Sequence, residues 1–137
     1  MDQNKCRALK DELEDAAEPA LVGVERFFDG NDDDASIGCN LSPHPGIATF
    51  RDVLTGLARR PDVRSVHLLI GEVDPGEEYW PFANAALIAG AIPETEARRA
   101  LKALKPDEVV PATSGDFGIT DELLEELGPP VLLAWWD

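Results

Sequence analysis

The chain has 137 residues, 44% of them hydrophobic and 28% charged, which is typical of one ordinary globular domain. Its 27 acidic and 12 basic residues leave a net charge of −15, which disfavours nucleic acid and anionic lipid as partners and favours cationic ones. Two cysteines are too few for a disulfide framework, and neither a secretory signal nor a membrane-spanning apolar stretch is present, so we expect a cytoplasmic protein with reduced thiols.

Apolar periodicity, prolines and glycines divide the chain into helices and strands. A helix is indicated, for example, where Ile47, Phe50 and Leu54 fall on one face after a proline suited to a first helical position. In chain order these signals predict a helix over 4–17, a strand over 20–24, a helical turn over 25–28, a helix over 45–60, strands over 63–73 and 82–91, a helix from 93 that ends before Pro106, a strand over 108–110, a helix between Thr120 and Gly128, and a strand over 131–136.

This order is βαββαβ, with an added N-terminal helix and an added C-terminal helix and strand. It predicts an α+β fold of the ferredoxin-like, split βαβ kind, in which a mainly antiparallel sheet carries helices on one face. We expect residues 1–18 to form a helical extension and residues 19–137 to form a single domain. The open sheet face needs cover from the N-terminal helix, the short C-terminal helix or a second copy in a homodimer. Trp135 and Trp136 must point to opposite faces of the sheet.

Basic residues gather in two groups, and none follows Lys105, whereas the last 32 residues carry eight acids. We interpret both groups as lying on helices. They are Arg51, Arg59, Arg60 and Arg64, and Arg98, Arg99, Lys102 and Lys105. The basic groups are then expected on the helical side of the sheet, with acidic loops around its ends.

The stretch Phe27–Gly46 concentrates the unusual chemistry of the chain, with four aspartates, two asparagines and three glycines. Part of it follows the order of an EF-hand calcium loop: Asp29, Asn31, Asp33 and Asn40. The invariant glycine position of such a loop holds Asp34, however, and the bidentate glutamate position holds Asn40, so we exclude an EF-hand. A looser divalent-cation site remains one interpretation. The other, which we favour, is a solvated turn whose side chains bond to nearby backbone.

Cys39 and His44 in the same stretch are a possible nucleophile and base, close to an expected helix start. Cys39 lies between two apolar residues, so a buried thiol is the simpler interpretation. Two cysteines and two histidines at scattered spacings match no zinc pattern. We therefore assign no catalytic residues, no metal and no cofactor.

A second candidate segment lies in the turn between the two central predicted strands. Glu77 and Glu78 precede Tyr79 and Trp80 there. Aromatic side chains beside carboxylates suit the rim of a protein-binding surface. They equally suit a loop folded onto its own core.

Several short segments resemble a family of small acidic bacterial proteins without an assigned activity. The central resemblance is carried by Phe27–Asp33, Ser36–Leu41 and His44–Gly46. It extends to Trp80–Phe82, Pro106–Val109 and Trp135–Asp137, and it leaves the N-terminal helix outside. The resemblance implies no catalytic residues. By analogy, small size and acidity are also similar to those of immunity proteins that neutralise basic toxins.

Our leading hypothesis is a non-enzymatic binding module, immunity- or inhibitor-like, that docks a basic protein. The loop carboxylates would steer the partner, and Trp80 or Tyr79 would anchor it. The alternative is a small-molecule or divalent-cation site within residues 27–46, possibly enzymatic through Cys39. The residues expected to bind are Asp29, Asn31, Asp32, Asp33, Asp34, Cys39, Asn40, His44, Glu77, Glu78, Tyr79 and Trp80.

Overall fold

Five strands form one antiparallel sheet in the computed structural model, which describes residues 1–137. The strands are β1 (Leu21–Gly23), β2 (Val63–Glu72), β3 (Phe82–Gly90), β4 (Glu108–Pro111) and β5 (Val131–Trp135). The α-helices are α1 (Gln3–Glu14), α2 (Val24–Phe28), α3 (Ile47–Ala58), α4 (Glu94–Ala100) and α5 (Asp121–Leu127). Short 3-10 helices are η1 (Asp34–Ser36), η2 (Lys102–Leu104) and η3 (Asp116–Gly118). The α+β class predicted from the sequence is confirmed.

The strand order is β1-β2-β3-β5-β4, and every neighbouring pair is antiparallel. In a ferredoxin-like sheet the strands flanking the first helix run parallel, with another strand between them. Here β1 and β2 are direct antiparallel neighbours, with Val22 opposite Leu68. The ferredoxin-like prediction is therefore wrong in its topology. The prediction assumed a crossover connection, which joins parallel strands. The connection through α2 and α3 instead brings the chain back beside the strand it left, in the opposite direction.

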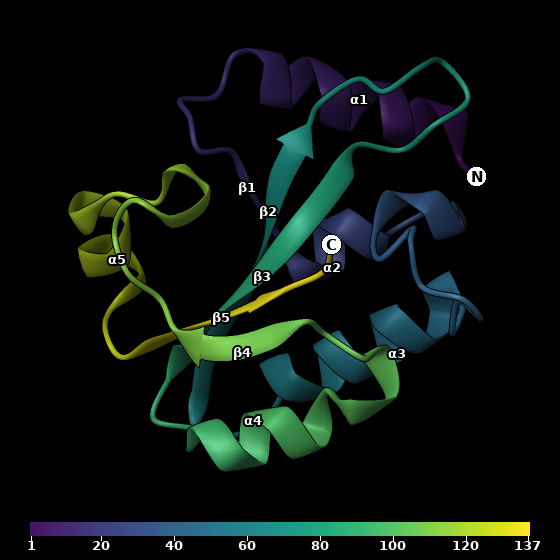
Figure 1. Ribbon diagram of the computed structural model, residues 1–137. Helices are drawn as coiled ribbons and strands as arrows, with labels where there is room; N and C mark the ends of the chain where they lie inside the picture. The colour runs from purple at the N-terminus through teal and green to yellow at the C-terminus, as the bar shows by residue number, and fades with distance from the viewer.

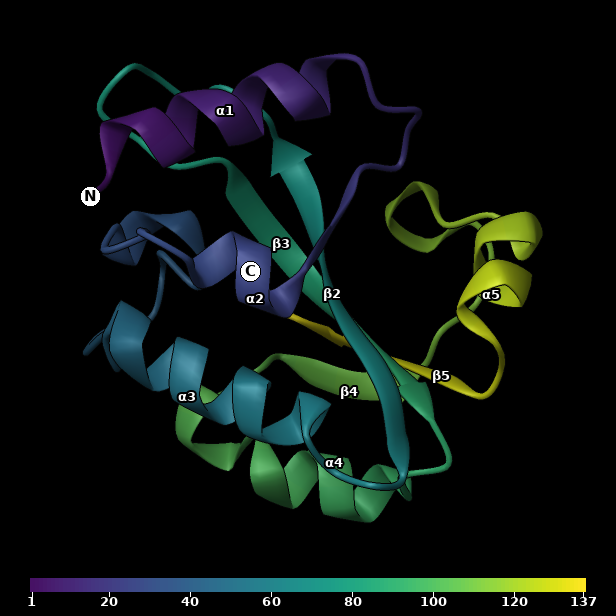
Figure 2. The same cartoon turned by 180° about the vertical axis from the view of Figure 1, so that it is seen from behind.

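The main core lies on one face of the sheet and is filled from four helices. Phe50, Leu54 and Leu57 of α3 are almost fully buried there, as are apolar side chains of α2 and α4. The N-terminal helix contributes Cys6 and Leu9 to the same cluster. Figure 1 and Figure 2 show α1 lying across the loop that joins β2 to β3, at one end of the sheet.

The opposite face of the sheet carries a smaller apolar cluster, which α5 and the loop before it cover. Figure 2 shows α5 on the other side of the sheet from α2 and α3. This cover comes from within the chain, so the sheet face gives no reason of its own to expect a homodimer. Trp135 packs on this side, whereas Trp136 is buried in the main core and donates its indole N–H to the Leu104 carbonyl at 2.8 Å. The prediction that the two tryptophans face opposite ways is confirmed.

The interpretation of the first basic group as helical is wrong for Arg64, which the strand predicted over 63–73 places correctly. Arg64 lies on β2 and donates hydrogen bonds to the carbonyls of Leu127 and Gly128, at the end of α5. A cation there satisfies carbonyl groups that a helix leaves unpaired at its C-terminus.

No helix in the structure combines the length and the apolar character that crossing a bilayer would need.

Candidate functional site

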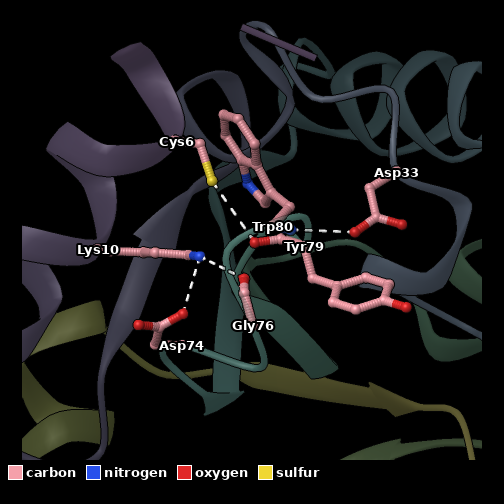
Figure 3. Close-up of polar contacts among 7 residues, drawn as sticks. All are labelled: Cys6, Lys10, Asp33, Asp74, Gly76, Tyr79 and Trp80. Carbon is pink, nitrogen blue, oxygen red and sulfur yellow. Dashed lines mark hydrogen bonds and ion pairs between the residues drawn. The ribbon is translucent and has the colours of Figure 1, made fainter. Parts of the chain in front are cut away.

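The two segments singled out in the sequence lie side by side in the structure. The carboxylate of Asp33 accepts a hydrogen bond from the backbone N–H of Trp80 at 3.0 Å (Figure 3). An isolated bridge between Ile37 and Ala83 joins the same two parts of the chain. The loop after α2 and the loop before β3 thus form one continuous surface, which the sequence alone did not connect.

Asp33 is the residue that fastens this junction. Its Oδ1 accepts the N–H of Ala35 at 2.9 Å and begins η1, while its Oδ2 holds Trp80. Asn31, which is buried, accepts the Asp33 N–H at 2.9 Å and donates to the Ser36 hydroxyl at 3.0 Å. These are bonds of the kind that Asx turns make, and they fix the loop from inside.

The other aspartates of the loop are exposed but also have partners within the chain. Asp29 pairs with Lys5 at 2.7 Å, and Asp32 pairs with the N-terminal ammonium at 2.9 Å. Asp34 accepts the N–H of Ile47 at 2.8 Å, at the first turn of α3, where the helix dipole favours an acid. The four carboxylates therefore point to four different partners. No group of three or more His, Cys, Asp or Glu side chains is placed to hold a metal ion.

Cys39 and His44 do not form a nucleophile and base in this arrangement. His44 Nδ1 accepts the N–H of Gly46 at 2.9 Å, so the proton of a neutral ring lies on Nε2, which is 2.9 Å from the carbonyl oxygen of Ile37. Both ring nitrogens are occupied by the backbone. Cys39 is exposed, contrary to the buried thiol that we favoured, and its neighbour Asn40 donates to the carbonyl of Asp137 at 3.0 Å.

A single glycine allows this loop to close over α3. Gly38 has a φ of +62°, and a Cβ on it would lie 2.7 Å from the ring of Phe50. Any other residue would be strained in the backbone and would also clash with a buried aromatic ring. Cys39, the next residue, is exposed to solvent.

Helix α1 holds the β2–β3 loop from the other side. The ammonium of Lys10, whose side chain is only 1% exposed, lies 2.9 Å from Asp74 and 2.7 Å from the Gly76 carbonyl (Figure 3). Cys6 Sγ is 3.5 Å from the carbonyl of Tyr79. Sequence reasoning missed this contact, although one signal was there, because Lys10 interrupts the apolar face of α1 between Leu9 and Leu13.

Trp80 is a core residue, so its expected role as a docking anchor is wrong. Its side chain is 1% exposed, because Asp33 fixes its backbone and the ring points into the main cluster. Tyr79, next to it, is 47% exposed and points outwards. Glu77 and Glu78 are exposed as well, and neither has an ion-pair partner. Of the two aromatic candidates, only Tyr79 is available to a partner.

These loops enclose a hollow of about 310 Å³, which we name the Tyr79 hollow. Its lining is mostly apolar and comes from both predicted segments: Asp33, Ala35, Cys39, Glu72, Pro75, Tyr79, Trp80 and Phe82. Glu72 is exposed at the end of β2 and has no ion-pair partner. The site is therefore an apolar depression lined by an exposed tyrosine and one unpaired glutamate, Glu72, on loops that internal hydrogen bonds hold in place. Two more unpaired glutamates, Glu77 and Glu78, directly precede the tyrosine in the chain.

The contacts of the Lys10 ammonium with Asp74 and Gly76, which we call the Lys10 clamp, give a pH-dependent prediction. The hydrogen bond from Lys10 lowers the pKa of Asp74 below its usual value of 3.8. Such a carboxyl stabilises the fold above its unfolded-state pKa, and that stabilisation is lost as the pH falls through the lowered value. We expect Asp74→Asn to melt below the parent at neutral pH, and the difference to shrink as the pH falls below about 3.8.

The measurement is the midpoint of thermal unfolding from neutral pH into the acid range. Asp11→Asn is the matched control, because Asp11 is exposed on α1 and has no ion-pair partner. It should follow the parent at every pH. A gap between Asp74→Asn and the parent that stays constant throughout the acid range would contradict the clamp.

Comparison with known proteins assigns the chain to a family. The model of the Uncharacterized protein YfbO family matches residues 4–126, which is most of the chain. The chain belongs to the YfbO family. The match includes α1, so the expectation that the N-terminal helix lies outside the family is wrong, and it ends before Trp135–Asp137. No match is found among curated proteins or among solved structures. The membership fits the resemblance to an uncharacterised family, and it brings no activity with it.

Proposed function

We propose that the chain is a non-enzymatic protein-binding module, in the manner of an immunity or inhibitor protein, and that the Tyr79 hollow docks a basic segment of its partner. The observation that supports this best is the exposure of Tyr79 beside an apolar hollow and unpaired carboxylates. Tyr79 and Phe117 are the only large hydrophobic residues of the chain that are exposed, at 47% and 37%.

A tyrosine in this position suits an anchoring role. Aromatic residues are enriched among the few side chains that dominate binding energy, since they bury a large area at a small entropic cost. The ring of Tyr79 can also take a lysine or arginine over its face. Glu77 and Glu78, immediately before it in the chain, can then meet the cationic head.

Charge supports a basic partner, but through different residues from those expected. The loop aspartates have partners within the chain, so they shape the site more than they attract a ligand. The unpaired carboxylates are Glu72, in the lining of the hollow, and Glu77 and Glu78, directly before Tyr79 in the chain. Together with the net charge of −15 on the whole chain, these carboxylates favour fast, salt-sensitive association with a cationic surface.

The test is capture of a partner from the native cell lysate, identification of that partner, and measurement of its affinity over a salt series. We expect the partner to be basic, and we expect Glu77→Gln with Glu78→Gln to weaken binding and flatten its salt dependence. The matched control is Glu125→Gln with Glu126→Gln on α5, which removes the same charge from two adjacent exposed glutamates.

Tyr79→Ala separates the anchor from the charge. It is expected to speed dissociation, because most affinity differences within one interface lie in the dissociation rate. An acidic or neutral partner, or equal weakening by the two glutamate pairs, would refute docking at the Tyr79 hollow.

A further inference from the structure

We propose that a groove between α2 and α3 binds a small organic anion through carboxylate or phosphate groups. This groove has a volume of about 730 Å³ and shares no residue with the Tyr79 hollow. We name it the arginine groove. Its lining is Glu25, Arg26, Phe28, Asp29, Gly30, Arg51, Thr55 and Arg59. The proposal is independent of the proposed protein-binding function.

The donors are arranged in a row. Arg51, Thr55 and Arg59 are four residues apart along α3 and its C-terminal cap, so they lie on one face, with roughly 6 Å between successive positions. The Thr55 hydroxyl has no hydrogen-bond partner, unlike that of Thr49, which donates to the carbonyl of Pro45 at 2.9 Å. A guanidinium at each end and a hydroxyl between them suit an anion with two acidic groups.

The groove contains one guanidinium that has no ion-pair partner within the chain. Arg59 has no carboxylate within ion-pair distance, although the chain carries 27 acids. Its neighbour Arg60, by contrast, is held by both Asp62 and Glu96 at 2.9 and 3.2 Å. Arg51 pairs only with the adjacent Asp52, at 3.2 Å. The Arg59 guanidinium is therefore available to a ligand.

The acids in the lining oppose an anion only weakly. Asp29 is paired with Lys5, and Arg26 pairs with Glu12 at 3.0 Å. Glu25 is the one lining carboxylate without an ion-pair partner. The lining therefore carries three guanidiniums against two carboxylates, a formal excess of one positive charge. The remaining field of the chain, at −15, repels extended polyanions, which restricts the ligand to a compact molecule of the size such grooves hold.

The experiment is a titration of the whole chain with inorganic phosphate, pyrophosphate, succinate and citrate, each against sodium chloride of equal ionic strength. The readouts are the melting midpoint and the NMR signals of the arginine side chains. We expect at least one anion to raise the midpoint saturably and to shift the signals of Arg51 and Arg59. A response to the first two probes alone identifies a phosphate ligand, and a response to the last two alone identifies a carboxylate ligand.

Arg51→Gln combined with Arg59→Gln should weaken the responding anion about tenfold or more, since charge-assisted hydrogen bonds are lost. The matched control is Arg7→Gln combined with Arg99→Gln, which removes equal charge from exposed positions outside the groove. The control should retain the parent affinity. The proposal is overturned if no anion exceeds the chloride response, if the shifted signals lie elsewhere, or if both double variants weaken binding equally.

Discussion

Replacement of Trp80 by alanine is expected to lower the free energy of unfolding by about 3–5 kcal/mol, the largest loss for any single residue near the candidate site. The side chain is almost completely buried in the main core, and its removal leaves a cavity that the surrounding sheet and helices cannot close. A loss of that size is a large part of the stability of a typical domain. The measurement is chemical denaturation followed by circular dichroism.

Two further variants make this result specific. Tyr79→Ala should change the free energy of unfolding by less than about 0.5 kcal/mol, because the ring is largely exposed. Trp80→Phe should cost less than half as much as Trp80→Ala, since it keeps most of the volume and removes a buried indole N–H that has no partner. Equal losses at positions 79 and 80 would contradict the division between core and rim.

The second large effect is expected at Asp33. Asp33→Ala removes the cap of η1 and the hydrogen bond to the Trp80 backbone together, and should lower the free energy of unfolding by about 2–3 kcal/mol. The same change should loosen the Tyr79 hollow, because the hydrogen bond that joins its two walls through Asp33 and Trp80 is lost. Hydrogen exchange of the Trp80 amide, measured alongside unfolding, should accelerate.

Asp32→Ala is the control for this substitution. Asp32 is the preceding residue, its side chain is 71% exposed, and its one partner is the N-terminal ammonium. Exposed ion pairs contribute little, so a change within about 0.5 kcal/mol is expected. Similar losses at positions 32 and 33 would mean that the acidic loop acts through its total charge, and that the Asp33 bonds do not hold the site together.

Local patterns were enough to predict most of the elements but not their order in the sheet. The helix containing Phe50 and the strands around Leu68 and Leu87 follow directly from apolar periodicity and proline positions. Pairing of β1 with β2 depends on how two helices return the chain, which no local pattern records. The position of the C-terminal strand, β5, between β3 and β4 is likewise not recorded in any local pattern.

The candidate site was predictable in its parts and not in its assembly. The stretch around Asp33 and the turn around Tyr79 both stood out by composition. Which carboxylates are free could not be derived, because it depends on long-range partners such as the Trp80 amide and the N-terminus. The clamp from Lys10 was hidden for a related reason: a lysine on a helix is usually solvated, and this one is buried by a loop that lies 64 residues further along the chain.

The most direct test of docking at the Tyr79 hollow uses Cys39, which lines it, as a reporter. Cys39 is exposed, whereas burial excludes Cys6 from solvent and raises the pKa of its thiol, so the folded chain should be alkylated at Cys39 alone. With the identified partner at saturation, we expect alkylation of Cys39 to fall to a small fraction of its rate in the free chain. An unchanged rate with the partner bound would contradict binding at this hollow.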